Sequence, residues 1–187
     1  DDLLKSLPPE AVPTPIPSGR WSLPLLLRFP FAGSTLIEAD ASRRAQALGT
    51  FNHIVCRILA QSPPGRVAFT IFDPVGLGQS FSGLTHLADE AEHLIDGRIW
   101  TQAAQMEERL ADLNDHLEKV IQMYLRNDFP TIAEYNEQAG NIAERFRFVV
   151  LADFPAGFTD LALRRLLAIA TAGARCGVFL LIHWDPT

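Results

Sequence analysis

Three nearly continuous apolar runs constrain the fold of this chain more than any other feature. They are Val67–Phe72, Phe146–Leu151 and Gly177–His183, and they are rich in β-branched and aromatic side chains. Strands with this pattern are buried on both faces, as they are in parallel sheets that helices cover on both sides. Helical patterns alternate with these runs. The sequence therefore predicts an α/β fold, a parallel sheet flanked by helices on both faces.

The first half of the chain predicts three further segments. The short apolar run Gly33–Glu38 indicates another buried strand, and the spacing of apolar residues over 42–60 predicts a helix. Breaker residues at Ser62-Pro63-Pro64-Gly65 end that helix. Val75–Asp96 is irregular and rich in glycine, so we expect a long loop of functional length there.

The second half contains the strongest helical pattern, Gln102–Arg126. Its apolar residues step by four and three, which leaves a coiled-coil seam as an alternative to a helix packed on the sheet. Thr159 is expected to N-cap a helix that runs through Ala172. Gly173 stands where a C′ glycine would end that helix.

The domain organisation follows from length and proline content. A chain of 187 residues predicts one domain, which we place at 33–187. Seven of the 13 prolines lie between Leu7 and Pro30, so residues 1–32 are expected to form a linker or a surface strap. Because the chain begins at Asp1, we expect it to be a piece of a longer parent.

Charge and cysteine content exclude several classes of function. The net charge of −6 makes this segment alone a poor partner for a phosphate backbone. No apolar run reaches 18 residues, so neither a membrane span nor export is predicted. Cys56 and Cys176 are interpreted as buried thiols, and so few cysteines suit a reducing, cytoplasmic location.

Polar residues follow the predicted strands. Asp73, Asp153 and the run His183-Trp184-Asp185 all stand at strand ends, and in an open parallel sheet ligands bind outside the carboxyl ends of the strands. Two carboxylates there could hold Mg²⁺ together with phosphate oxygens. The alternative is that each aspartate caps the next turn, particularly Asp73, which precedes Pro74.

The sequence does not contain a standard phosphate-binding loop. The first predicted strand leads into Glu38-Ala39-Asp40-Ala41-Ser42-Arg43-Arg44, which has no glycine or lysine and two acids. Arg43 or Arg44 could supply positive charge, or could simply be solvated. Gly76-Leu77-Gly78 is interpreted as turn chemistry. The histidines do not pair at zinc-ligand spacing, and no motif for a catalytic nucleophile is present.

Several segments resemble FtsK/SpoIIIE-type translocase ATPases over about Ser34–Pro186. Phe69–Pro74 and Thr85-His86-Leu87 resemble the second core strand and its loop, and Phe148–Phe154 resembles the Walker B strand. The other matching segments are Leu117-Glu118-Lys119, Ile132–Glu137 and Arg175–Leu181.

This resemblance implies a RecA-like P-loop motor fold. Such motors usually form ring hexamers that use ATP and Mg²⁺ to move DNA or, in the secretion branch, proteins. Walker A is absent, and the two Walker B acids are reduced to Asp153. Depending on the register, Asp153 matches either the Mg²⁺ ligand or the acid that positions the attacking water, and the other acid is lost. Arg175, or Arg164 and Arg165, could act in trans as an arginine finger, although the latter two could equally be a solvated helix face.

Two functions are therefore expected. The first is a degenerate, non-hydrolysing motor domain that serves assembly, regulation or partner docking in a larger DNA-translocase or secretion-type ATPase, as a homo-oligomer that contacts DNA only through the assembly. The second is an active ATPase domain in which Arg43 or Arg44 replaces the usual lysine. A third reading, a structural α/β or coiled-coil module unrelated to motors, stays open.

Overall fold

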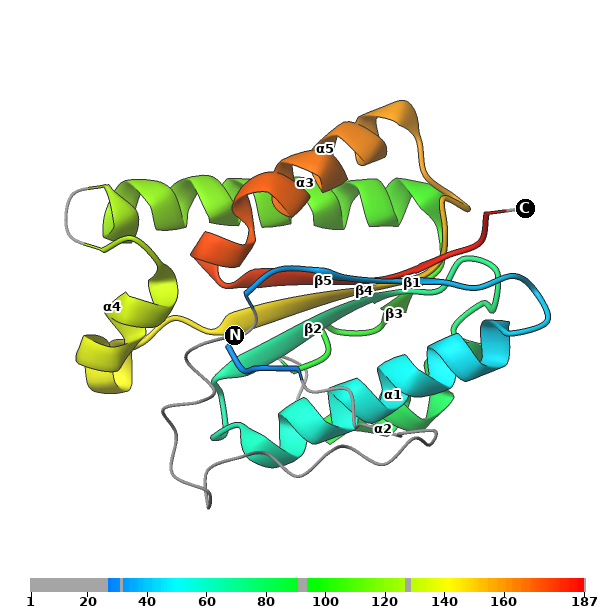
Figure 1. The fold of residues 1–187 in the computed structure, drawn as a ribbon, viewed down its shortest axis with the longest axis horizontal. Helices are drawn as coiled ribbons and strands as arrows, with labels where there is room; N and C mark the ends of the chain where they lie inside the picture. Colours follow the sequence, from blue (N-terminus) through cyan, green and yellow to red (C-terminus); the bar gives the residue numbers. More distant parts are fainter. Residues whose placement is uncertain (1–26, 31, 91–93, 127–128, 187) are drawn as a thin grey trace, which may run out of the picture.

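The computed structural model describes residues 27–30, 32–90, 94–126 and 129–186 (Figure 1). Within them, five parallel strands form one sheet in the order β1-β5-β4-β2-β3. The α/β fold class with an all-parallel sheet is thus confirmed. The strands are β1 Thr35–Glu38, β2 Val67–Phe72, β3 Ile99–Trp100, β4 Phe146–Phe154 and β5 Val178–Trp184.

Helices cover both faces of this sheet (Figure 1). On one face lie α1 and α2, and on the other lie α3 and α5, while α4 packs near the end where β4 begins. The helices are α1 Arg44–Gln61, α2 Ser82–Glu90, α3 Ala103–Val120, α4 Ile132–Ala139 and α5 Asp160–Ala172. Short turns complete the described chain: 3-10 turns η3 Gln79–Phe81, η5 Gly140–Ile142 and η6 Ala174–Cys176, and the π-helical turn η4 Ile121–Leu125.

Two hydrophobic cores lie on the two sides of the central strands. On the α1 side, the Phe148 ring packs against those of Phe69 and Phe179, with centroids 5.3 and 5.4 Å away. On the other side, Val149 and Leu151 pack with Met106 of α3. Because β2 is buried at every position, its continuous apolar pattern reflects contacts on both faces.

The coiled-coil alternative for the long helix is wrong. The residues of its four-three pattern belong to the same buried core as β4 and α5, so the domain covers this seam itself. Asn114 fixes the contact by donating from Nδ2 to the Arg165 carbonyl oxygen at 3.1 Å. The helical path continues past Val120 as the π-helical turn η4.

Two predictions about segments need correction, and one strand was not predicted. The strand predicted at 33–38 is an edge strand that pairs only with β5, and Leu36 is 54% exposed. The loop predicted over Val75–Asp96 contains η3 and α2, because Phe81 and Leu84 are buried in the core under α1. The two-residue strand β3 is too short to leave a sequence pattern.

The predicted helix cap is confirmed at one end of α5 only. Thr159 Oγ1 accepts a hydrogen bond from the Ala162 N–H at 3.1 Å. Gly173, however, has φ −60°, because the chain continues into the turn η6 rather than reversing there. The left-handed residue is Gly177, at φ 76°, just before β5.

The two cysteines also differ. Cys176 is buried as predicted, and burial raises the pKa of its thiol. Cys56 is exposed, because α1 turns it away from the sheet. A prediction of burial from an apolar helix pattern is therefore wrong for Cys56.

Most of the predicted proline-rich strap lies outside the described residues, and the boundary at residue 33 stays a prediction. In its described part, the Phe29 ring packs edge-on against that of Phe146 at 5.3 Å. No helix in the described ranges has both the length and the apolar character needed to cross a membrane.

Candidate functional site

Four side chains meet where the central strands end. Asp73 follows β2, Asp153 lies near the end of β4, and His183 lies in β5, as the strand-end pattern predicts. The fourth side chain is that of Arg44, the first residue of α1. Asp73 and His183 are fully buried and Asp153 is 8% exposed, so their polar groups need partners inside the protein.

Arg44 forms a two-point contact with Asp153. Its Nε is 2.6 Å from Oδ1 and its Nη2 is 2.6 Å from Oδ2. The same Nη2 donates to Ser80 Oγ at 3.1 Å and lies 3.5 Å from Asp73 Oδ1. The hydrogen bond with Asp153 raises the pKa of Arg44. A paired fork of this kind is among the stronger polar contacts in proteins.

Asp73 orders the turn after β2. Its Oδ1 accepts from the Gly76 N–H and its Oδ2 from the Ser80 N–H, each at 3.0 Å. A side chain at position 76 would meet both carboxylate oxygens, with a Cβ 2.5 Å from Oδ1 and 2.6 Å from Oδ2. The turn-capping interpretation of Asp73 is therefore the observed one, although Asp73 also contributes negative charge beside Arg44.

His183 fixes the backbone that presents Asp153. Asp153 has φ 56°, a left-handed conformation that is uncommon for a residue with a side chain. Its N–H donates to His183 Nδ1 at 3.1 Å. His183 Nε2 is 3.0 Å from the Ala39 carbonyl oxygen. Because Nδ1 accepts from the Asp153 N–H, the donor to the Ala39 carbonyl oxygen is assigned to Nε2, and the ring bridges the ends of β4 and β1.

Asp40 closes the turn before α1. Its Oδ1 accepts from the N–H groups of Ser42 and Arg43, at 3.0 and 3.2 Å, and from the Ser42 hydroxyl at 2.5 Å. The hydroxyl contact is the main reason why the pKa of Asp40 is lowered. Amides before a helix are the groups that bind phosphate in nucleotide-binding loops. Here a carboxylate of the same chain already uses two of the amides just before α1, those of Ser42 and Arg43.

The site as folded does not fit Mg²⁺ and a nucleotide phosphate. Both oxygens of Asp153, the expected Mg²⁺ ligand, contact Arg44, and Asp40 uses the amides that precede α1. Within the described part of the chain, no group of three metal-binding side chains comes together. The arrangement is a closed network of one guanidinium and two buried carboxylates. It holds α1 to the strand ends.

The other predicted residues lie elsewhere. Arg43 is exposed at the N-cap of α1, and its side chain makes no capping hydrogen bond. Asp185 follows β5, where its N–H donates to the Phe154 carbonyl oxygen at 3.3 Å. Arg175 lies in η6, before β5, and therefore at the opposite end of the sheet from Asp153. A finger role for Arg175 in a neighbouring subunit stays a prediction.

The two arginines of α5 differ. Arg164 is exposed. Arg165 donates from Nη1 to the Glu107 carbonyl oxygen at 2.9 Å and thus links α5 to α3. The solvated-face interpretation therefore describes Arg164 and does not describe Arg165.

Sequence reasoning missed the roles of two residues in this region, Ser80 and Asp40. Ser80 had no signal, because it lies in a segment that was interpreted as loop. Asp40 was counted only as a charge that would repel phosphate, although an aspartate two residues before a serine at a helix start is typical of a side-chain-capped turn. That pattern was the available signal.

Comparisons with known proteins agree on the fold. No protein-family model matches the chain, and no curated protein sequence matches it. Solved structures do match. The conjugation coupling protein TcpA of pCW3, solved with ATPγS, is 17% identical with a TM-score of 0.57, over 82% of this chain and 43% of that one.

Two secretion ATPases give similar values. ATPases 2 and 3 of EssC from Geobacillus thermodenitrificans are 16% identical with a TM-score of 0.63, over 82% of this chain and 28% of that one. The cytoplasmic domain of the type VII secretion ATPase EccC from Thermomonospora curvata is 16% identical with a TM-score of 0.60, over 80% and 16%.

These neighbours are FtsK/SpoIIIE-type ATPases, so the resemblance read from the sequence is confirmed at the level of the fold. The chain spans less than half of the length of each of them.

Proposed function

We propose that this chain is a non-hydrolysing FtsK/SpoIIIE-like motor domain that serves assembly, regulation or partner docking in a larger DNA-translocase or secretion-type ATPase. The observation that carries the proposal is the Arg44–Asp153 pair. The one Walker B-like carboxylate of the chain is bound at both oxygens by an internal cation, in the position where a motor domain would bind Mg²⁺ and phosphate.

Two further features support the proposal. Asp40 uses the amides before α1, so a phosphate there would have to displace a carboxylate and overcome its charge. The matching solved structures are parts of larger ATPases, and this chain spans 16–43% of them. A closed domain of the same fold suits a role as a rigid, partner-binding unit in a parent chain or a ring.

The alternative is an active domain in which Arg44 replaces the phosphate-binding lysine and Asp153 holds Mg²⁺. It requires Arg44 to leave Asp153 when nucleotide binds. The match to TcpA, which was solved with ATPγS, is the observation that keeps this alternative.

Isothermal titration calorimetry with ATP, with and without Mg²⁺, separates the two. We expect no Mg²⁺-dependent ATP binding in the unchanged chain or in Asp153→Asn. The control is Arg57→Ala, which changes an exposed arginine of α1, and it should not bind either. Mg²⁺-dependent binding that is lost in Asp153→Asn but kept in Arg57→Ala would overturn the proposal. Circular dichroism of each variant shows that it is folded.

The variant Arg44→Ala tests what the pair does. Removal of the guanidinium frees both oxygens of Asp153, yet Asp40 still uses the amides before α1. We therefore expect Arg44→Ala to gain no Mg²⁺-dependent ATP binding. A gain would identify Arg44 as a gate over a working nucleotide site, which supports the alternative.

A further inference from the structure

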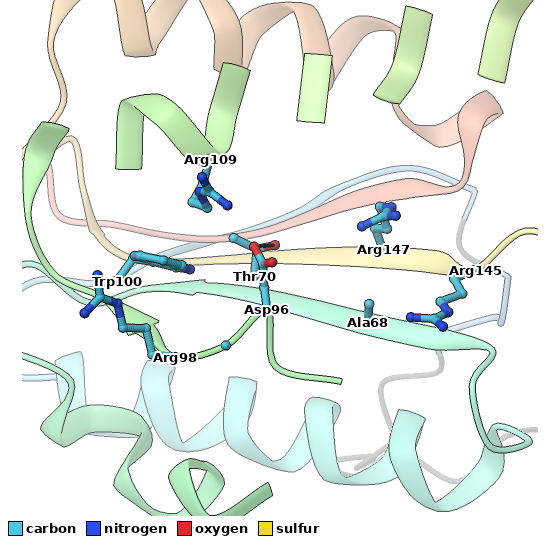
Figure 2. Close-up of a pocket in the computed structure, with 9 residues that line it drawn as sticks. Ala68, Thr70, Asp96, Arg98, Trp100, Arg109, Arg145 and Arg147 are labelled. Carbon is cyan, nitrogen blue, oxygen red and sulfur yellow. Dashed lines mark hydrogen bonds between the residues drawn. The ribbon is translucent and has the colours of Figure 1, made fainter. Parts of the chain in front are cut away.

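A second polar site lies on the α3 face of the sheet, away from Arg44. It is a pocket of about 670 Å³ lined by Arg98, Trp100, Arg109, Arg145 and Arg147, with Asp96 as its one acid (Figure 2). We call it the arginine pocket.

Local sequence explains why the pocket is open. Ala68 and Thr70 of β2 face α3, while the alternate residues Phe69 and Ile71 face α1. Ala68 and Thr70 are small, so a gap remains between β2 and the arginines above them. Arg147 pairs with Ala68 across the sheet.

Arginine side chains lie at both ends of the pocket. Arg145 and Arg147 lie at one end, and Arg98, Trp100 and Arg109 lie at the other (Figure 2). Trp100 pairs with Phe72, four residues beyond Ala68 along β2, which corresponds to about 13 Å at the rise of a strand. One phosphate group cannot touch both ends, but a chain of phosphates can.

The charge in the pocket is unbalanced. Four guanidinium groups and one carboxylate, that of Asp96, line the pocket, and Asp96 accepts a hydrogen bond from Thr70 Oγ1 at 3.2 Å. Arg109 is already partly compensated by carboxylates outside this lining. Arg109 Nη2 contacts Glu108 and Asp112 at 3.0 and 2.9 Å. Arg147 is partly buried, and this burial lowers its pKa. A ligand that brings several negative charges would complete the site.

Three donors on this pocket have no partner. Among the described residues, Trp100 Nε1, Arg109 Nε and Arg147 Nε are buried without a hydrogen bond. Buried donors are almost always satisfied, so these three call for acceptors that the described residues do not supply. Each side of the Trp100 ring already faces a cation, with Arg98 at 4.5 Å and Arg109 at 5.2 Å from its centroid (Figure 2). The indole therefore offers its N–H rather than a stacking face.

We propose that the arginine pocket binds an oligophosphate, through phosphate oxygens that accept from Trp100, Arg109 and Arg147. Guanidinium forks match phosphate oxygens, and a triphosphate brings several negative charges to a pocket that is lined by more guanidinium groups than carboxylates. Carboxylates spaced along a peptide would bring less charge into the same volume. Because the indole faces are covered, the phosphate chain is recognised and an attached nucleoside is not.

The test is calorimetric titration of tripolyphosphate, ATP, inorganic phosphate and adenosine into the unchanged chain without Mg²⁺. We expect tripolyphosphate and ATP to bind with equal affinity, inorganic phosphate more weakly, and adenosine not at all. Arg147→Gln and Arg98→Gln should each weaken tripolyphosphate at least tenfold, while Arg164→Gln, an exposed arginine on α5, should leave it unchanged. In NMR spectra the Trp100 indole N–H resonance should shift on binding.

Three results would overturn the proposal. They are no binding at millimolar tripolyphosphate, equal weakening by Arg164→Gln, and equal competition by a glutamate-rich peptide. Failure here is separable from failure of the proposed function. The arginine pocket acts without Mg²⁺ and depends on Arg147, whereas a working motor site would need Mg²⁺ and Asp153.

Discussion

Arg44 holds both carboxylate oxygens of Asp153 at 2.6 Å, although the two residues are 109 positions apart in the sequence. The pair joins the start of α1 to the end of β4. Under the proposed function, this pair is what keeps Mg²⁺ and phosphate away from the strand ends.

Removing this guanidinium should destabilise the domain. Arg44→Ala leaves the carboxylate of Asp153, which is 8% exposed, without its cation, and we expect a loss of about 2–3 kcal/mol in the free energy of unfolding. Arg44→Lys keeps the charge but not the fork, so it should lose about half as much. Urea unfolding followed by circular dichroism measures both. Equal stability of Arg44→Ala and the unchanged chain would contradict a structural role.

His183 should stabilise the folded domain through its hydrogen bonds with two backbone groups. His183→Phe leaves the Asp153 N–H and the Ala39 carbonyl without their partner, so we expect a loss of about 2–4 kcal/mol. Trp184→Phe, at the neighbouring half-exposed position, serves as the control and should cost less than about 1 kcal/mol. If the two variants unfold at the same urea concentration, the bridge contributes nothing measurable.

Two glycine substitutions should have opposite effects. Gly76→Ala places a Cβ 2.5 Å from Asp73 Oδ1 and displaces that carboxylate, with an expected loss of about 2 kcal/mol. Gly49→Ala, inside α1 with open space around it, should stabilise by about 0.5–1 kcal/mol. Thermal unfolding measures both signs. If Gly76→Ala raises the melting temperature, the turn can accommodate the added Cβ and the prediction is wrong.

His116 should make stability depend on pH. Burial, and next the charge of Arg147, lowers its pKa from 6.5 to about 4. Below pH 6.5 the unfolded chain binds the proton more readily than the folded one, so stability falls as the pH drops from 6.5 toward 4. We expect this group to account for about 1–2 kcal/mol, allowing for its partial exposure.

The comparison uses unfolding curves of the unchanged chain and of His116→Gln at pH 7 and pH 4.5. The stability difference between the two proteins should change with pH in favour of the variant at pH 4.5. If that difference is the same at both values, His116 has no part in the pH dependence.

The two thiols should react at very different rates. Cys56 is exposed, whereas Cys176 is buried and its thiol has a raised pKa. A colorimetric thiol reagent should therefore label one cysteine in the folded chain and the second only after urea is added. Cys56→Ser should remove the fast reaction, and rapid labelling of that variant would contradict the burial of Cys176.

The sequence determined four of the five strands and most of the helices, because burial on one or both faces imposes a repeat on neighbouring residues. β2 is found at the predicted residues, and α1, β4, α5 and β5 lie within a few residues of their predicted bounds. The Thr159 cap was also predictable from the sequence, because the capping hydroxyl and the Ala162 amide that donates to it are only three residues apart. The exposure of Cys56 and the edge position of β1 were not predicted, since the pattern of one segment does not say what packs beside it.

Only the tertiary structure decided the sites. Strand ends predicted that Asp73, Asp153 and His183 would converge, yet nothing in the local pattern assigned Arg44 to Asp153 rather than to solvent or phosphate. The arginine pocket likewise combines residues from β2, β3, β4 and α3. The physical reason is that a polar contact depends on distance and orientation in space, which residues far apart in the sequence acquire only when the sheet and helices pack.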